Sequence, residues 1–220
     1  ERARNVEERV LLARTLDRAE IVLRSGIIQF TDFYDPYHTG LIISTVRACP
    51  GLAATPWGGI PAAERVRTAV HEAGVEPVPE DYDIGFIFIR GNFKMNRVTH
   101  RDFLGALLGL GLKREKLGDI LVAENGAAVA AAGDVLPYIR SGLDKVGKVR
   151  VSVEDISPEE LRQTGAPYRE VRATLPSLRL DAVAAAGYGT SRSRLVPEIQ
   201  AERFSVNWRP CRDPATPVRE

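Results

Sequence analysis

The residues best suited to bind a ligand lie near the C-terminal end of the sequence. Ser191-Arg192-Ser193-Arg194 follows a Gly-Tyr-Gly break, so Ser191 is expected to cap a helix that starts there. Both arginines would stand in its first turn, where the helix dipole disfavours a cation. A phosphate bound at that end would make the position favourable for the arginines, because backbone N–H groups, a hydroxyl and two guanidiniums would converge on it. The pattern predicts binding of RNA phosphates; the alternative is a capped surface helix with scattered arginines.

Two further polar residues flank this segment. Arg179 belongs to an Arg-Leu-Asp run at the start of the preceding helix and is expected to face the same groove. Asn207 belongs to a Val-Asn-Trp run on a short strand that follows the second helix. Together with residues 191–194 they form the predicted RNA-binding site of the C-terminal segment.

A second basic group lies in the middle of the chain. Arg101 opens a helical segment, and Lys113 and Arg114 follow it in a loop. These side chains are expected to form a second RNA-facing patch, although solvated surface charges would give the same pattern. The glycines of the segment are interpreted as packing devices that let the helix approach a sheet closely: Gly105, Gly109 and Gly111.

Residue types that support catalysis or metal binding are scattered. His38, His71 and His100 lie in separate segments without the spacing of a zinc site, which needs about four ligands. Cys49 and Cys211 have neither metal-site spacing nor a recognisable activating neighbour. The sequence therefore predicts no catalytic residue, no metal and no cofactor, and we expect a protein that is not an enzyme.

Composition supports an ordinary globular protein. Of 220 residues, 44% are hydrophobic and 27% are charged, and the net charge is only +1, so the overall charge does not indicate a polyanionic partner. No apolar run approaches the roughly 18 residues of a membrane helix, and the first residues lack a secretory signal. We expect a cytoplasmic protein with no membrane partner and no small-molecule substrate.

Hydrophobic periodicity and turn residues predict the elements that must position these groups. The expected helices cover residues 1–26, 61–73, 100–110, 134–146, 178–186 and 191–200. The expected strands cover residues 84–90, 119–122, 127–131, 148–153 and 204–208, while 41–47 is a helix or a strand. The middle of the chain thus has the β-α-β-β-α-β order of RRM-like and ferredoxin-like domains.

This order makes the fold class α/β (α+β), with three predicted domains. They are an N-terminal α/β domain at residues 1–78, an RRM-like RNA-binding domain at 79–156 and a C-terminal domain at 170–220, with a connector between the last two that includes Gly165-Ala166-Pro167. RRM domains stack bases on exposed aromatic side chains of their sheet. Phe86 and Phe88 share one face of their strand by its period of two, but we expect them to face the core.

The C-terminal motifs resemble a known RNA-binding domain. The Arg-Leu-Asp run, the glycine turn, the Ser191–Arg194 segment and the Val-Asn-Trp run resemble, in this order, the S-four-type RNA-binding domain. In that family two helices form an L that presents basic residues to structured RNA. The sequence stops before the final strands, so the domain is expected to be incomplete at its C-terminal end.

The central segment resembles one family more closely. Residues 100–120, HRDFLGALLGLGLKREKLGDI, are similar to the signature of the YlmH family, and 30–36, 58–59 and 63–65 resemble its N-terminal landmarks. The resemblance implies a protein of ribosome-associated quality control that docks on rRNA, on tRNA and on the large ribosomal subunit. Plastid and cyanobacterial relatives are known as photosystem II S-four proteins.

Two alternatives remain open at this stage. RNA pseudouridine synthases often carry an S-four-like domain and place a catalytic aspartate in an Arg-Leu-Asp motif, which would give that role to Asp181. An adaptor protein in cell division is suggested only by the gene neighbourhood of the resembling family. A uridine-isomerisation assay and a pull-down with division proteins would distinguish them.

Overall fold

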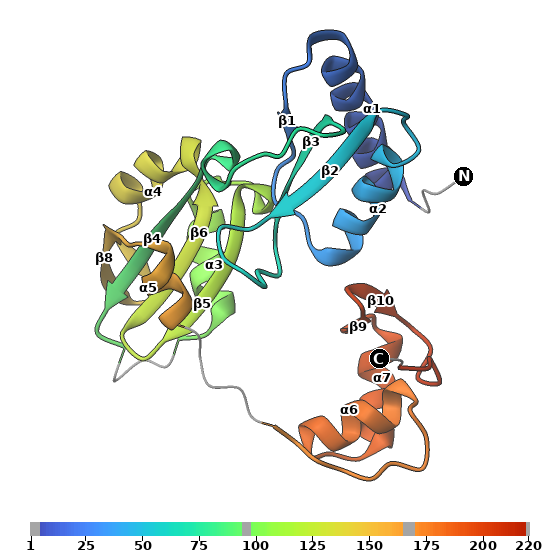
Figure 1. Cartoon of the computed structure of the whole chain (residues 1–220). Helices are drawn as coiled ribbons and strands as arrows, with labels where there is room; N and C mark the ends of the chain where they lie inside the picture. The colour runs from blue at the N-terminus through green and yellow to red at the C-terminus, as the bar shows by residue number, and fades with distance from the viewer. Residues whose placement is uncertain (1–4, 94–97, 165–169, 219–220) are drawn as a thin grey trace. The chain divides into compact units, whose positions relative to one another are not determined.

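The computed structural model describes residues 5–93, 98–164 and 170–218. The chain divides into two compact units, residues 1–166 and 167–220 (Figure 1). Helices and antiparallel sheets occur in both units, which confirms the predicted mixed α/β class. Residues 165–169, which contain the predicted Gly-Ala-Pro connector, lie outside the described residues. The three domain boundaries stay predictions.

The first part of unit 1, called the N-terminal module here, is a small sheet with two helices. It comprises α1 (Val6–Ser25), β1 (Gln29–Phe30), α2 (Pro36–Val46), β2 (Leu52–Trp57) and β3 (Arg67–Glu72). The antiparallel strand order is β1-β3-β2. Both helices pack with the sheet around one apolar core made of Ala19, Val22, Val46, Leu52 and Val70. The ambiguous segment 41–47 is therefore mostly helical.

The helix predicted at residues 61–73 is wrong. The second half of this range forms β3, which is the central strand of the sheet and pairs with both neighbours. Pro61 and the acidic residue behind it resemble a helix start, but Val66, Thr68 and Val70 alternate with the period of a strand. Pairing on both sides buries residues 68–71 almost completely, and this tertiary context outweighs the local helix signal.

The second part of unit 1, the central module, is a five-stranded antiparallel sheet covered by helices. It comprises β4 (Ile84–Gly91), α3 (His100–Gly109), β5 (Leu117–Ala123), β6 (Gly126–Ala132), α4 (Leu136–Gly142), β7 (Lys145–Val146), β8 (Val149–Asp155) and α5 (Pro158–Gln163). Its strand order is β5-β6-β4-β8-β7, with β4 between β6 and β8, as in a split βαβ arrangement. The second helix ends earlier than predicted, at Gly142, and β7 follows.

The two faces of this sheet bury different sets of side chains. On one face, Ile87 and Ile89 pack with α3 and α4 in the main core. On the other face, Phe88 packs with Ile60 and with Leu161 of α5, and Phe86 joins them at the edge. Phe88 is therefore buried as expected, but in a second core on the face opposite α3 and α4. Helix α5 covers the surface on which an RRM would stack bases.

The central glycines are not the packing devices predicted from the sequence. Helix α3 turns Gly105 and Gly109 toward solvent, and a Cβ atom added at either position would meet nothing within 4 Å. Gly111 is equally open, but its φ of +87° explains the glycine, because that backbone conformation ends the helix. Close packing occurs instead at Gly118 of β5, where a Cβ atom would lie 2.9 Å from Cε1 of Phe33.

Two segments of the N-terminal module are hydrogen-bonded to the central module at a junction called the seam here. Arg65 donates from Nε to the carbonyl of Leu117 at 3.0 Å and from Nη2 to the carbonyl of Phe33 at 2.7 Å. The carboxylate of Asp119 accepts the backbone N–H groups of Glu64 and Arg65 at 2.8 and 2.9 Å. The Phe33 N–H also donates to the Glu115 carbonyl at 2.8 Å, and together these bonds fix residues 31–35 and 63–67 against residues 114–119.

Unit 2 contains two helices and a hairpin. They are α6 (Leu180–Tyr188), α7 (Arg192–Gln200), β9 (Phe204–Val206) and β10 (Arg209–Cys211). The two helices and β9 pack around Leu180, Leu195 and Ile199. Residues 213–218 return to the start of α6, where the Leu180 N–H donates to the Thr216 carbonyl at 2.9 Å.

The open surroundings of Gly105 give a direct test of this fold. Replacing Gly105 by alanine should stabilise unit 1 by about 0.5–1 kcal/mol, because glycine inside a helix costs conformational entropy and nothing here resists a methyl group. The comparison is Gly126→Ala, whose Cβ atom would lie 2.0 Å from the Ile89 carbonyl oxygen and should destabilise the unit. Urea unfolding followed on NMR signals of unit 1 measures both; a loss of stability in Gly105→Ala would contradict the placement.

Candidate nucleic-acid interface

The predicted C-terminal site is a corner between α6 and α7. Helix α6 ends at Gly189, whose φ of +62° provides the left-handed cap, and the chain turns directly into Ser191, the N-cap of α7. The side chain of Ser191 makes no capping hydrogen bond; its Oγ instead lies 3.2 Å from Oγ of Ser193. The expected capping role of Ser191 is therefore met by position but not by the hydroxyl.

Arg192 and Arg194 point to solvent from the first turn of α7. Both residues are exposed, and among the residues that the structure describes neither has a carboxylate within ion-pair distance. The first turn of α7 carries no acidic side chain, so these cations stand at a helix end whose dipole disfavours them. Such an arrangement leaves both guanidiniums available to an external anion.

Arg179 has a different environment. It is the N-cap of α6, and its guanidinium bonds both carboxylate oxygens of Asp181, at 3.1 and 3.3 Å. The Asp181 side chain is only 9% exposed, and the hydrogen bond from Arg179 lowers the pKa of its carboxyl group, with burial acting against it. The predicted contact of Arg179 with RNA stays a prediction, and an internal carboxylate already binds its guanidinium.

Asn207 lies on the hairpin and not on the helical corner. Asn207 and Trp208 have φ values of 50° and 61° and form the two-residue turn between β9 and β10. Positive φ at both central positions is the geometry of a type I′ turn, which favours asparagine. The local backbone therefore explains Asn207 without a ligand.

One aromatic residue at this corner was missed by the sequence reasoning. Tyr188 is 73% exposed at the end of α6, directly before the glycine turn, and its ring meets Phe204 edge-on at 5.7 Å. An exposed ring beside exposed guanidiniums is suited to base stacking. The Gly-Tyr-Gly break was the available signal, but it was interpreted only as a turn.

The second predicted patch separates into two environments. Arg101, in the first turn of α3, and Lys113 are exposed. Arg114 is half-buried and donates from Nη1 to the carbonyls of Leu117 and Gly118 at 2.7 and 3.3 Å. The predicted RNA contact of Arg101, Lys113 and Arg114 stays a prediction, and of the three only Arg114 is bonded to carbonyls within the described part of the protein.

Lys116, the last basic residue of this loop, is also held by other side chains. Its ammonium group lies 3.3 Å from Asp32 and 2.9 Å from Asp134, so it connects the N-terminal module to the central one. The hydrogen bond that Lys116 donates to Asp134 raises the pKa of Lys116. Lys116 thus belongs to the seam and not to an RNA-facing surface.

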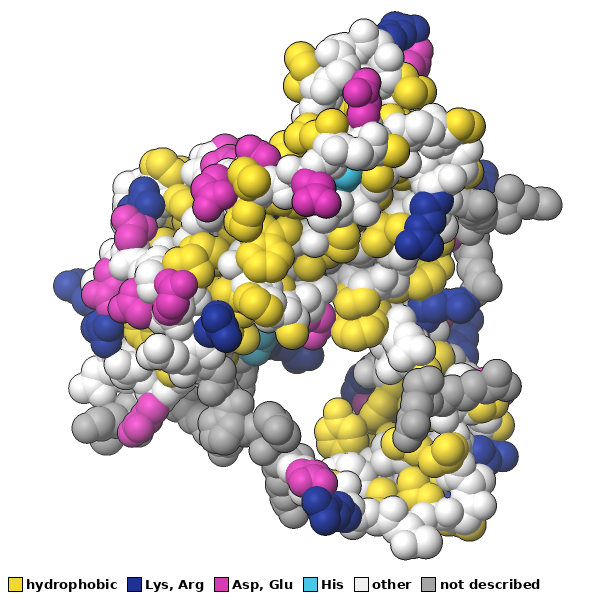
Figure 2. Space-filling model, in the orientation of Figure 1, with side chains coloured by type: hydrophobic (Ala, Val, Ile, Leu, Met, Phe, Trp, Pro, Cys, Tyr) yellow, Lys and Arg dark blue, Asp and Glu magenta, His cyan; other side chains and the backbone are white. Residues whose placement is uncertain are grey.

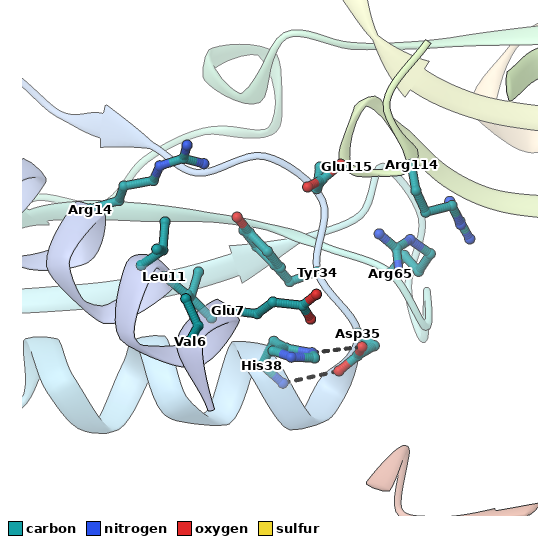
Figure 3. Close-up of a pocket in the computed structure, with 11 residues that line it drawn as sticks. Val6, Glu7, Leu11, Arg14, Tyr34, Asp35, His38, Arg65, Arg114 and Glu115 are labelled. Carbon is teal, nitrogen blue, oxygen red and sulfur yellow. Dashed lines mark hydrogen bonds and ion pairs between the residues drawn. The ribbon is translucent and has the colours of Figure 1, made fainter. Parts of the chain in front are cut away.

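A pocket opens at the seam between α1, the start of α2 and the loop before β5 (Figure 3). Its volume is about 550 Å³, and it is lined by Val6, Glu7, Val10, Leu11, Arg14, Tyr34, Asp35, His38, Arg65, Arg114 and Glu115. Arg65 was not predicted as a site residue. Burial, followed by the neighbouring charge of Arg65, lowers the pKa of Arg114 to about 10.

A histidine–aspartate pair forms the floor of this pocket. His38 Nδ1 lies 2.8 Å from Oδ2 of Asp35, whose other oxygen caps α2 through the His38 N–H at 3.0 Å (Figure 3). The hydrogen bond to the Asp35 carboxylate raises the pKa of His38 above 6.5, although burial opposes it. Burial alone would raise the pKa of the Asp35 carboxyl group, but the hydrogen bonds with His38 outweigh burial and lower that pKa.

The sheet face covered by α5 is unsuited to a polyanion. Figure 2 shows acidic side chains gathered over the part of unit 1 that carries β8 and α5, and Glu154, Asp155, Glu159 and Glu160 are exposed there. Within the described ranges, no group of three or more histidine, cysteine, aspartate or glutamate side chains is placed to hold a metal. In the same ranges, no helix has both the length and the apolar character needed to cross a membrane.

Comparisons with known proteins agree on one family. A family model described as “Putative RNA-binding domain in YlmH” matches residues 77–160, and one described as “YlmH, N-terminal” matches residues 7–75. The chain is 33% identical over 216 residues to the Bacillus subtilis (strain 168) “Ribosome-associated protein quality control protein P2”, covering 97% of this chain and 83% of that protein. It is also similar to the solved structure “Cell division protein ylmH from Streptococcus pneumoniae”, with a TM-score of 0.61 and 27% identity over 73% of this chain and 97% of that one.

The histidine environments give a testable pH dependence. In an NMR titration His38 should titrate above 6.5, and His100, whose pKa is lowered by burial and then by Arg114, should titrate below it. Stability from the raised His38 pKa should be fully present below pH 6.5, while Asp35 stays ionised, and should be lost as the pH rises through the raised pKa. The lowered pKa of His100 acts in the opposite direction, so its contribution should be present above pH 6.5 and lost as the pH falls through that pKa.

Asp35→Asn isolates the pair from the helix cap. Asparagine caps helices as well as aspartate does, so α2 should remain while the charge partner is lost. The pKa of His38 should then fall. An unchanged His38 titration in this variant would show that Asp35 is not its partner.

Proposed function

The chain belongs to the YlmH family, and on this premise we propose that it is an RNA-binding protein that docks on the large ribosomal subunit and on tRNA. Its cellular role would be quality control of ribosomes that hold stalled nascent chains, in the cytoplasm. Support comes from the name of the Bacillus subtilis relative and from the matched RNA-binding domain model. Both point to ribosomes and RNA as partners.

The observation that carries the proposal is the exposure of Arg192 and Arg194. In this chain, of net charge +1, many arginines have carboxylate partners, as Arg140 has Asp155 and Arg203 has Glu198. At the corner of unit 2, by contrast, two guanidiniums stand exposed at a helix end that disfavours them. Bound phosphate would remove this penalty and would accept charge-assisted hydrogen bonds.

A second contact would come from Arg101 and Lys113 of the central module. These two side chains are exposed, whereas Arg114 and Arg179 are already partly engaged by carbonyls and by Asp181. Two moderate contacts on linked domains raise overall affinity without any single strong site. Recognition would rest on phosphate positions and RNA shape, with Tyr188 available to a base.

We propose further that the chain performs no bond chemistry. The aspartate of the synthase alternative, Asp181, lies almost fully buried in the first turn of α6 with its carboxylate bonded to Arg179. These contacts favour a structural role that holds the start of the helix. The adaptor alternative gains only the words “cell division protein” in the name of the Streptococcus pneumoniae relative.

The phosphate-binding role of the corner predicts a specific loss of ribosome binding. Changing Arg192 and Arg194 together to glutamine should weaken binding by about 1–3 kcal/mol for each lost charge-assisted hydrogen bond. The salt dependence should also become shallower, by about one unit of slope for each phosphate contact removed. Cosedimentation with large subunits over a salt series measures both quantities.

The matched control changes Arg203 and Arg212 of the same unit to glutamine. These arginines are paired with Glu198 and Glu202, so the control loses the same charge but no exposed guanidinium at the corner. It should bind as the unchanged protein does. If both double variants weakened ribosome binding equally, net charge alone would explain the loss and the proposed site would be overturned.

The proposed absence of chemistry is tested on uridine isomerisation. The unchanged protein, incubated with unmodified transcripts of ribosomal RNA and tRNA, should produce no pseudouridine detectable by carbodiimide labelling followed by mass spectrometry. If pseudouridine formed and Asp181→Asn abolished it without unfolding unit 2, the synthase alternative would be correct. A circular dichroism spectrum and a thermal melt of the variant control for folding.

A further inference from the structure

The pocket at the seam has no role in the proposed function, yet it collects an unusual set of charges. Three arginines, Arg14, Arg65 and Arg114, line it together with His38. Its acidic residues are Glu7, Asp35 and Glu115, of which Asp35 is already bonded to His38. The arginine end of the pocket is therefore cationic.

Arg65 and Arg114 lie side by side at this end (Figure 3). Arg65 Nε and Arg114 Nη1 donate to the same carbonyl oxygen, that of Leu117, at 3.0 and 2.7 Å. The two donor nitrogens are thus within about 6 Å of each other, a separation at which like charges repel in a partly buried site. The carbonyls of Phe33 and Gly118 hold the same two guanidiniums at fixed angles.

Most of the hydrogen-bonding capacity of the pair remains available. A guanidinium has five N–H donors, and each of these arginines uses two of them on carbonyl oxygens. Over the described part of the chain, neither forms an ion pair with a carboxylate. The nearest acidic side chain of β5, Asp119, instead accepts two backbone N–H groups. Carboxylates lie close enough to act on the charges of both arginines, among them Asp119 and Glu64, but none of those described is within ion-pair distance. Two half-buried, rigid cations with free donors form a preorganised site for an anion with several oxygens.

The opposite side of the pocket is formed by α1, which contributes apolar side chains together with Glu7 and Arg14. Val6 and Val10 of α1 line it and remain 71% and 44% exposed, and Leu11 lies behind them. The half-buried ring of Tyr34 stands between this wall and the arginines (Figure 3). A volume of about 550 Å³ lies within the usual range for small-ligand sites, roughly 300–1,000 Å³.

We propose that this pocket binds a single nucleotide unit, with its phosphate on Arg65 and Arg114 and its base against Tyr34 and the apolar edge of α1. The phosphate supplies an anion bound directly to the free donors of both guanidiniums, and the base covers side chains that are otherwise exposed. The nucleotide comes either from a terminal or looped-out position of an RNA or from a free mononucleotide. The site goes beyond the proposed function, since it does not depend on the α6–α7 corner.

Titration of the unchanged full chain with adenosine monophosphate tests the site by NMR. The side-chain Nε–H signals of Arg65 and Arg114 should shift saturably, and the Tyr34 ring signals should shift through stacking. Inorganic phosphate should move only the arginine signals, and adenosine should move mainly those of Tyr34. Absence of a saturable arginine shift at millimolar adenosine monophosphate would overturn the proposal.

Two variants and a control add a test by affinity. Arg114→Gln and Tyr34→Leu should each weaken binding of adenosine monophosphate at least tenfold. Arg140→Gln removes an exposed arginine of the central module that is ion-paired with Asp155 and does not line the pocket, so it should bind as the unchanged protein does. Thermal melts identify any variant that fails to fold, and the shifts of the unchanged protein remain decisive in that case.

A short single-stranded oligoribonucleotide distinguishes the two sources. Tighter binding of the oligoribonucleotide than of adenosine monophosphate, with the same Arg65 and Arg114 shifts, identifies RNA; equal or weaker binding identifies a free mononucleotide. The pocket and the corner of unit 2 are separate sites if Arg114→Gln loses nucleotide binding but cosediments normally with ribosomes. The converse result is expected for the double variant Arg192→Gln, Arg194→Gln, which should lose ribosome binding and keep nucleotide binding.

Discussion

The seam is the constraint on which the organisation of unit 1 depends. The Asp119 carboxylate binds the backbone at Glu64 and Arg65, and the Arg65 guanidinium then reaches the carbonyls of Leu117 and Phe33. Each of these groups would lose a partner if another were removed, and buried polar groups without partners are costly. The seam therefore joins the N-terminal module to β5, and the pocket exists because this junction brings α1 and α2 to the loop before that strand.

Arginine and lysine side chains fall into two groups in this molecule, those bonded to other groups of the protein and those exposed to solvent. Arg65, Arg114, Lys116 and Arg179 are engaged by carbonyls or carboxylates that fix segments of the fold. A second group, formed by Arg101, Lys113, Arg192 and Arg194, stays exposed. The net charge of +1 conceals this division, because it counts internal and external cations equally. The contribution of a basic residue to RNA binding depends on its free donors.

The surface covering of the central sheet limits how RNA can be recognised. The aromatic side chains of β4 pack beneath α5 and Ile60, and exposed carboxylates surround them. Stacking of bases on this sheet would require α5 to leave. Recognition through phosphates and RNA shape is favoured instead. It would use the exposed guanidiniums and Tyr188 of unit 2 and the exposed Arg101 of α3.

Local patterns in the sequence determined the mixed α/β class, the β-α-β-β-α-β order and the two helices around the glycine turn, because periodicity and turn chemistry act within a few residues. They also placed Arg192 and Arg194 in a helix start. Only the tertiary structure decided that residues 67–72 form a central strand and that Asp181 forms an ion pair with Arg179. It also decided that Arg65 meets β5, through hydrogen bonds between groups 52 and 54 positions apart in the chain. Such contacts leave no local period, so no reading of neighbouring residues reveals them.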